Sequence, residues 1–117
     1  MPSGFGGALM QVKIRTWGSN TFAYMVLATD VIKCAVDSST GNLSSCVTDN
    51  GGVASGAWYA TSIDFSNLGG SMTYAYISDQ TASTIYVCTV NTTTGTLSSC
   101  APSAASGLTQ PWAAVVY

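Results

Sequence analysis

Short apolar runs rich in β-branched residues alternate with polar turns along the whole chain. Residues 85–100 show the pattern most clearly: an apolar run from Ile85 to Val90, a polar turn that contains Gly95, and a second run that begins at Leu97. Two such runs joined by a glycine-containing turn predict a β-hairpin. Because helical spacing of apolar residues does not persist over the length of a helix anywhere, the sequence predicts an all-β fold.

The hairpin occurs twice. Residues 31–46 match residues 85–100 at a shift of 54 positions, with the turn glycines Gly41 and Gly95 in register. A hairpin loop commonly needs a residue with positive φ, which glycine adopts without steric cost. Both glycines are therefore expected to be turn residues with positive φ, and the chain is expected to be a repeat protein.

The cysteines follow the same repeat. Folding the second hairpin back about Thr94 sets Cys88 opposite Cys100, and the shift of 54 positions sets Cys34 opposite Cys46. Directly opposed residues of an antiparallel pair lie within reach of a disulfide. A four-thiolate zinc site is the alternative, but its ligands usually come in close pairs. The sequence predicts the bridges Cys34–Cys46 and Cys88–Cys100, and hence an oxidising compartment.

Two further strands precede each hairpin. One is aromatic, at residues 22–24 and 74–76. The other begins with a turn residue and a large aromatic residue, at 4–10 and, 53 positions later, at 57–63. Residues 111–117 have the same form. The predicted organisation is two four-stranded antiparallel repeats and one extra C-terminal strand: residues 1–54, 55–110 and 111–117.

Both faces of the predicted strands are apolar. Along residues 21–27, one face carries Ala23 and Met25 and the other carries Phe22 and Tyr24. A sheet with one face in water would alternate apolar and polar residues, whereas a sheet covered on both faces does not. Each repeat is therefore expected to pack between two neighbouring sheets, as the blade of a propeller does.

The repeat resembles that of a known group of proteins. Its pattern of Tyr-x-Tyr-Ile-Ser-Asp, Ile-Tyr-x-Cys-x-Val, Thr-Gly-x-Leu-Ser-x-Cys and Pro-Trp is similar to the blade repeat of secreted bacterial β-propeller proteins, which are related to lactonase-like and NHL-type propellers. The resemblance covers essentially the whole chain and is strongest over residues 72–117. It implies two propeller-like blades but no activity, because the motif positions are structural. A propeller closes with about four to eight blades, and this chain supplies two and a strand.

Charge and composition narrow the function. Only three basic and five acidic residues occur among 117, for a net charge of −2. Three basic residues cannot form a nucleic-acid-binding surface. The longest apolar run, residues 23–28, is too short to span a membrane. No signal peptide is visible, yet the predicted disulfides and the weakly charged, hydroxyl-rich composition favour an extracellular or cell-surface location.

Catalysis has few candidate residues. The chain contains no His and no Glu, so general acid–base chemistry would depend on dispersed aspartates or a tyrosine. We therefore expect no enzyme, no catalytic residue, no metal site and no cofactor. Asp37 and Asn91 begin the two hairpin turns, where a short polar side chain can bond the backbone. Residues 49–52 resemble a calcium loop but lack further oxygen ligands at regular spacing, so a turn is favoured.

A carbohydrate is an alternative ligand. Aromatic side chains can stack on sugars, but those at repeated positions are expected to lie in the core. Trp17 has no counterpart in the second repeat, so it is the candidate for an exposed contact. Asn42 and Asn91 begin glycosylation tripeptides.

The final strand suggests assembly. It has no partner within its own repeat and is apolar throughout: Trp112, Ala113, Ala114, Val115, Val116 and Tyr117. A strand with open backbone groups pairs with another sheet. The leading hypothesis is a non-enzymatic extracellular structural subunit that self-assembles by strand exchange into a fibre or a ring. The alternatives are a fragment of a larger ligand-binding or lactonase-like propeller, and a small carbohydrate-binding propeller module.

Overall fold

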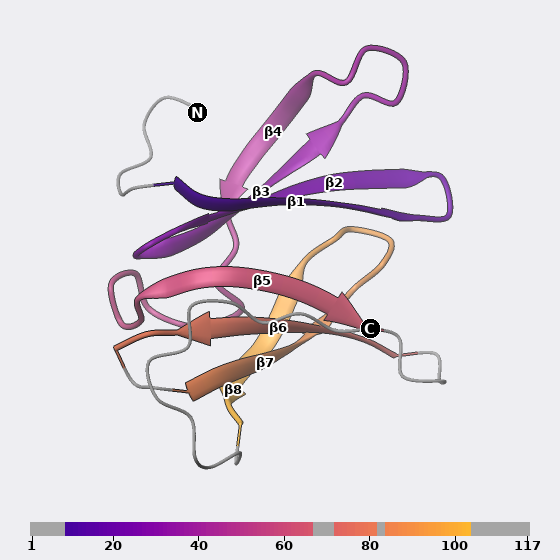
Figure 1. The fold of residues 1–117 in the computed structure, drawn as a ribbon. Coiled ribbons are helices and arrows are strands. Elements are labelled where there is room, and N and C mark those ends of the chain that lie inside the picture. Colours follow the sequence, from indigo (N-terminus) through magenta and orange to yellow (C-terminus); the bar gives the residue numbers. More distant parts are fainter. Residues whose placement is uncertain (1–8, 67–71, 82–83, 104–117) are drawn as a thin grey trace.

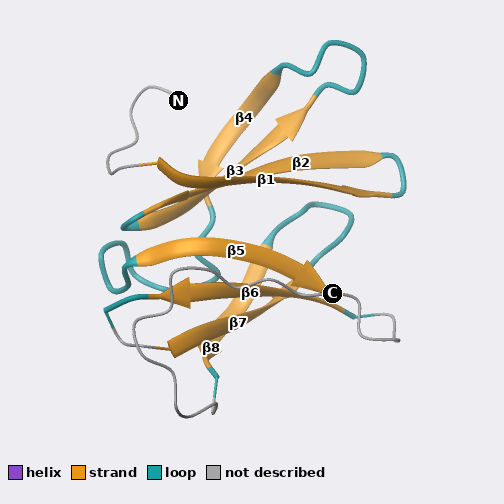
Figure 2. Cartoon of the chain, in the orientation of Figure 1, coloured by secondary structure: helices purple, strands orange, loops and turns teal. Residues whose placement is uncertain are grey.

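The chain folds into two stacked β-sheets (Figure 1). The structure, a computed structural model, describes residues 9–66, 72–81 and 84–103. This part of the chain forms eight strands and no helix: β1 (Leu9–Trp17), β2 (Asn20–Leu27), β3 (Asp30–Val36), β4 (Leu43–Thr48), β5 (Ala60–Ser66), β6 (Thr73–Asp79), β7 (Thr84–Val90) and β8 (Leu97–Pro102). Each sheet is an antiparallel meander, β1 to β4 or β5 to β8 (Figure 2). The predicted all-β fold with two four-stranded antiparallel sheets is confirmed.

The sheets share irregularities as well as strand order. A β-bulge interrupts the β1–β2 pair between Leu9 and Gln11, and another interrupts the β5–β6 pair between Ala60 and Ser62. Leu9 therefore corresponds to Ala60, a shift of 51 positions. One aromatic residue in each repeat predicts that the first strands of the two repeats align at a shift of 53 positions. That alignment is two residues too long, because the hydrogen-bond register pairs equivalent residues at a shift of 51.

The hairpin register differs from the prediction at the tip. Folding about Thr94 would pair Val90 with Ser98, but Val90 pairs with Leu97. Ser99 is the extra residue of a bulge, and its φ of 53° is the left-handed conformation common at such sites. The bulge lies at the cysteine pair, where Cys88 faces both Ser99 and Cys100, so Cys88 and Cys100 stay opposed as predicted. The first repeat has the same bulge, with Ser45 also at 53°.

Each sheet has two distinct faces, which we call front and back. The back face carries the aromatic residues of β2 or β6, and the front face is the opposite one. In the first sheet the back face carries Phe22, Tyr24, Val26, Val31 and Lys33, and the front face carries Val12, Ile14, Ala23, Met25, Cys34 and Leu43. In the second sheet the back face carries Tyr74, Tyr76, Ser78 and Val87, and the front face carries Ile63, Phe65, Ala75, Ile77, Cys88 and Leu97.

The sheets stack front to back. The back face of the first sheet and the front face of the second form one buried cluster, in which the Tyr24 and Phe65 rings lie 4.7 Å apart. A second cluster, which includes Met25 and Ile32, covers the middle of the first sheet's front face. Every residue from Phe22 to Leu27 is buried. Strand β2 is therefore buried on both faces, but the sheet that contains it is not covered on both faces, because Val12 and Ile14 on its front face are 48% and 47% exposed.

The connection between the sheets is a hydrogen-bonded turn. The Asn50 side chain accepts a hydrogen bond from Val31 N (2.8 Å) and donates one to Asp30 (2.7 Å). The Gly51 carbonyl accepts from Cys100 N at 3.0 Å. Residues 49–52 thus contain a turn, as expected, but Asp49 and Asn50 are buried and not on the surface, and the segment joins the two repeats through backbone and side-chain contacts.

Candidate functional site

The β7–β8 hairpin tip docks on the back face of the first sheet. The Tyr24 hydroxyl donates a hydrogen bond to the Gly95 carbonyl at 2.6 Å, in a buried environment. Burial raises the pKa of Tyr24, and the charge of Asp49 raises it further. The phenol therefore keeps its proton at neutral pH and remains a donor. This bond joins residues 71 positions apart and ties the second repeat to the first.

Two further residues of the first sheet hold the tip. A Cβ atom on Gly95 would lie 2.8 Å from Cγ of Phe22, so the turn backbone packs directly on that ring. Lys33 Nζ donates to the Thr94 carbonyl at 2.9 Å and lies 5.7 Å from the Phe22 ring centroid. Gly95 has a φ of +74°. It therefore combines the positive φ that the turn was expected to need with a close approach that the sequence did not reveal.

The turns themselves are built alike. The Asp37 carboxylate accepts hydrogen bonds from Ser39 N and Thr40 N, at 2.8 and 3.1 Å. The Asn91 side chain accepts from the corresponding Thr93 N and Thr94 N at 2.9 and 3.1 Å. The turn interpretation of Asp37 and Asn91 is thus confirmed, and their oxygens serve the backbone.

Asp49 fixes the start of β8. Its two carboxylate oxygens lie 3.2 and 3.0 Å from Leu97 N, which donates to them. Desolvation by burial raises the pKa of Asp49, although the Leu97 N–H, Lys33 and the Gly51 N–H act in the opposite direction. The buried Asp49 carboxylate, which follows the first repeat's hairpin, thus holds the start of β8 in the second repeat.

Charges also connect β1 with β5. Arg15 donates to the Asp64 carboxylate at 2.6 Å, and Lys13 Nζ lies 3.7 Å from the same oxygen. Ile63 N donates to the Gln11 side chain at 2.6 Å. Arg15 and Lys13 are partly exposed, so solvent screens their side of these pairs, whereas the Asp64 side chain is only 3% exposed and needs a charged partner there.

Trp17 is not the exposed contact that its lack of a counterpart indicates. Its ring lies 5.5 Å from that of Phe65 and 6.2 Å from those of Phe22 and Tyr24. It is half-buried and packs against the core between the sheets. The prediction of an exposed residue is wrong because Trp17 lies on the back face of the first sheet, where its ring packs against Phe65 of the second sheet.

Both disulfides form as predicted. The Cα atoms are 4.1 Å apart in Cys34–Cys46 and 4.0 Å apart in Cys88–Cys100. The second bridge lies in the cluster between the sheets, and a Cβ on Gly51 would collide with the Cys100 sulfur. The first bridge packs on the front-face cluster of the first sheet.

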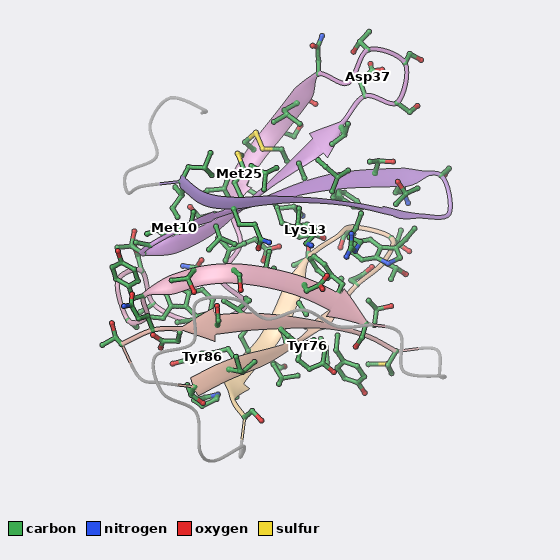
Figure 3. The ribbon with its side chains drawn as sticks, viewed as in Figure 1. Met10, Lys13, Met25, Asp37, Tyr76 and Tyr86 are labelled. Carbon is green, nitrogen blue, oxygen red and sulfur yellow. A yellow bond between two sulfur atoms is a disulfide. The ribbon has the colours of Figure 1, made fainter. Side chains whose placement is uncertain are left out.

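The first repeat has the same hairpin tip and front face as the second, but no strand of the described residues lies on them. Val12 is 48% exposed, whereas the corresponding Ile63 is 0% exposed. Leu43 is 44% exposed, whereas the corresponding Leu97 is 2% exposed. A Cβ on Gly41 would meet no described atom within 4 Å. Asp37 marks this tip, which projects away from the second sheet (Figure 3). Positions that are covered in the second repeat are therefore open in the first.

Other kinds of site find little support in the described part of the chain. Residues 9–66, 72–81 and 84–103 contain no group of three or more candidate metal ligands and no pocket. Within the same ranges, no helix is long and apolar enough to span a membrane. The proposed assembly strand, residues 112–117, lies outside the described residues.

Comparisons with protein-family models, with curated proteins and with solved structures found no match to this chain. What the chain does is therefore inferred from its own sequence and fold.

Sequence reasoning found the cysteines and the turn glycines but missed the docking residues. Phe22, Tyr24 and Lys33 carry no motif, and their partners lie more than sixty positions away. One signal was present. An aromatic strand, Phe22-Ala-Tyr24 or Tyr74-Ala-Tyr76, precedes each of the two hairpins. This pattern is expected if the aromatic strand of one repeat binds the hairpin turn of the next.

Proposed function

We propose that the chain is a non-enzymatic extracellular structural subunit that self-assembles into a fibre or a ring of propeller-like sheets. The observation that carries this proposal is the exposure of Val12 and Leu43 at positions where the second repeat buries Ile63 and Leu97. Within the chain, a back face covers the second repeat's front face. A second copy supplies another back face of the same kind.

The contact is heterologous, because a front face meets a back face. Repetition of such a contact gives a closed ring if the rotation per repeat closes, and an open fibre if it does not. The apolar segment 112–117 adds a second contact in this proposal, by pairing with a strand of a neighbouring copy.

The composition supports a structural role outside the cell. The chain holds no His and no Glu for general acid–base catalysis. Its two disulfides are compatible with an oxidising compartment. A net charge of −2 gives little repulsion between copies.

Sedimentation velocity over a range of concentrations tests the proposal. The wild-type chain should sediment faster as its concentration rises, and Val12→Asp should remain at the mass of one chain. Val47→Asp is the matched control, since Val47 is equally exposed, at 48%, but lies opposite Lys33 on the other face of the same sheet. A wild-type chain that stays at 12.0 kDa throughout would contradict the proposal and favour a fragment of a larger propeller.

A further inference from the structure

We infer that the β3–β4 hairpin tip, residues 37–42, docks on Tyr74 and Tyr76 of a second copy of this chain. The inference rests on the proposed function and specifies the contact that would direct it. Its basis is the contact inside the chain, where the β7–β8 tip docks on Phe22 and Tyr24. Each partner in that contact has a counterpart in the other repeat.

The receiving side is repeated in β6. Register places Tyr74 and Tyr76 where Phe22 and Tyr24 stand in β2, since Tyr74 pairs with Thr89 as Phe22 pairs with Ala35. The Tyr76 hydroxyl accepts a hydrogen bond from Ser66 Oγ at 3.2 Å. Its own hydrogen is then directed elsewhere, as the Tyr24 hydrogen is directed to Gly95. Tyr76 lies on the second sheet in Figure 3.

The inserted side is repeated in the first hairpin. Gly41 has a φ of +76° and Gly95 one of +74°, and each N–H bonds the carbonyl of the residue that begins its turn, at 2.7 and 2.6 Å. The two tips therefore present their backbone carbonyls alike. Every residue from Asp37 to Asn42 is exposed, whereas Gly95 is buried. The Gly41 carbonyl of one copy is the acceptor that matches the Tyr76 hydroxyl of the next.

One difference sets the strength of the contact. Lys33 bonds the tip inside the chain, but Val87 occupies the corresponding position on the second sheet. The contact between copies thus lacks a charged hydrogen bond that the internal one has. Association between copies should therefore be weaker than the packing of the two sheets within a chain. A lysine in place of Val87 should strengthen it.

Two substitutions in the full chain test the contact in opposite directions. Tyr76→Phe removes one hydrogen bond and should raise the dissociation constant between copies about two- to tenfold. Val87→Lys restores the missing donor and should lower it by about fivefold or more. Tyr24→Phe is the matched control: it should lower the melting temperature of the dilute monomer more than Tyr76→Phe does, because the Tyr24 hydroxyl makes a buried 2.6 Å bond to Gly95, whereas Tyr76→Phe costs the monomer only the part-buried 3.2 Å bond from Ser66.

Cross-linking identifies the docked residues. A photoreactive benzophenone side chain replaces Thr40 in one variant and the corresponding Thr94 in another; both threonines are exposed. The Thr94 variant should cross-link within the chain, to peptides that contain Phe22 or Lys33. The Thr40 variant should cross-link between isotopically distinguishable copies, to peptides that contain Tyr74 or Tyr76.

The outcomes separate the inference from the proposed function. If Val12→Asp abolishes association but Tyr76→Phe and Val87→Lys do not change it, and Thr40 cross-links elsewhere, copies associate but not through this tip. If the wild-type chain does not associate at all, both the proposed self-assembly and the docking of the hairpin tip are wrong.

Discussion

Gly95 packs against the ring of Phe22, whereas Gly41, at the same place in the other hairpin, meets no described side chain. A Cβ at residue 95 would lie 2.8 Å from the ring, and a Cβ at residue 41 would have no described neighbour within 4 Å. One turn is therefore part of an interface and the other is not, although their sequences and dihedrals are nearly the same.

This difference predicts unequal costs for equal substitutions. Gly41→Ala should lower the free energy of unfolding by about 1 kcal/mol, because the Cβ of alanine makes a positive φ unfavourable. Gly95→Ala should cost about 2–4 kcal/mol, since the methyl group must also displace Phe22. Chemical denaturation of the two variants measures both values. Equal losses would mean that the second hairpin does not dock on the first sheet.

Asp49 should make stability depend on pH. Its pKa is raised by burial in the folded chain, so the folded state binds the proton more tightly than the unfolded state. The corresponding stabilisation is fully present below the unfolded pKa and is lost as the pH rises through the folded one. Wild type should therefore gain stability relative to Asp49→Asn as the pH falls from about 7 to about 3. A difference that is constant, or that grows in favour of Asp49→Asn on acidification, would argue against this.

The disulfides should contribute alike through chain entropy but differ in packing. Each closes a loop with a sequence separation of 12, which is worth about 3 kcal/mol in the chain-entropy model. Cys88→Ala with Cys100→Ala should cost more than Cys34→Ala with Cys46→Ala, because Cys88 and Cys100 lie in the cluster between the sheets. Thermal unfolding compares the pairs. Peptide mapping without reduction checks the connectivity, and a Cys34–Cys88 peptide would refute it.

Much of the fold could be predicted because it depends on local patterns. Short apolar runs separated by polar turns identified the strands, and the recurrence of cysteine and glycine at fixed spacing identified the hairpins and their bridges. The bulge at Ser99 was not predictable, since no glycine or asparagine marks its positive φ.

The candidate site was harder to predict because its contacts are long-range. Tyr24 and Gly95 meet only when the second repeat stacks on the first, and local spacing carries no record of that stacking. For Trp17 the sequence predicted exposure, because this residue has no counterpart in the second repeat. In the structure its ring packs against Phe65 of the other sheet.

The C-terminal segment has its own test. Deletion of residues 111–117 should weaken assembly, since an apolar strand that pairs with a neighbouring copy would be lost. Electron microscopy and sedimentation of the truncated chain, beside the intact one, measure the effect. Normal assembly after truncation would rule out strand donation and leave front-to-back stacking as the single contact.

Front-to-back stacking is tested most directly by mixing two blocked variants. Val12→Asp blocks the front face but leaves the back face intact, and Tyr76→Asp does the reverse. In chains that also lack residues 111–117, so that strand donation cannot contribute, each variant alone should remain at the mass of one chain. Because each supplies the face that the other lacks, their equimolar mixture should form a particle of two chains and nothing larger. A mixture that stays at the mass of one chain, while the wild type associates, would contradict stacking of a front face on a back face.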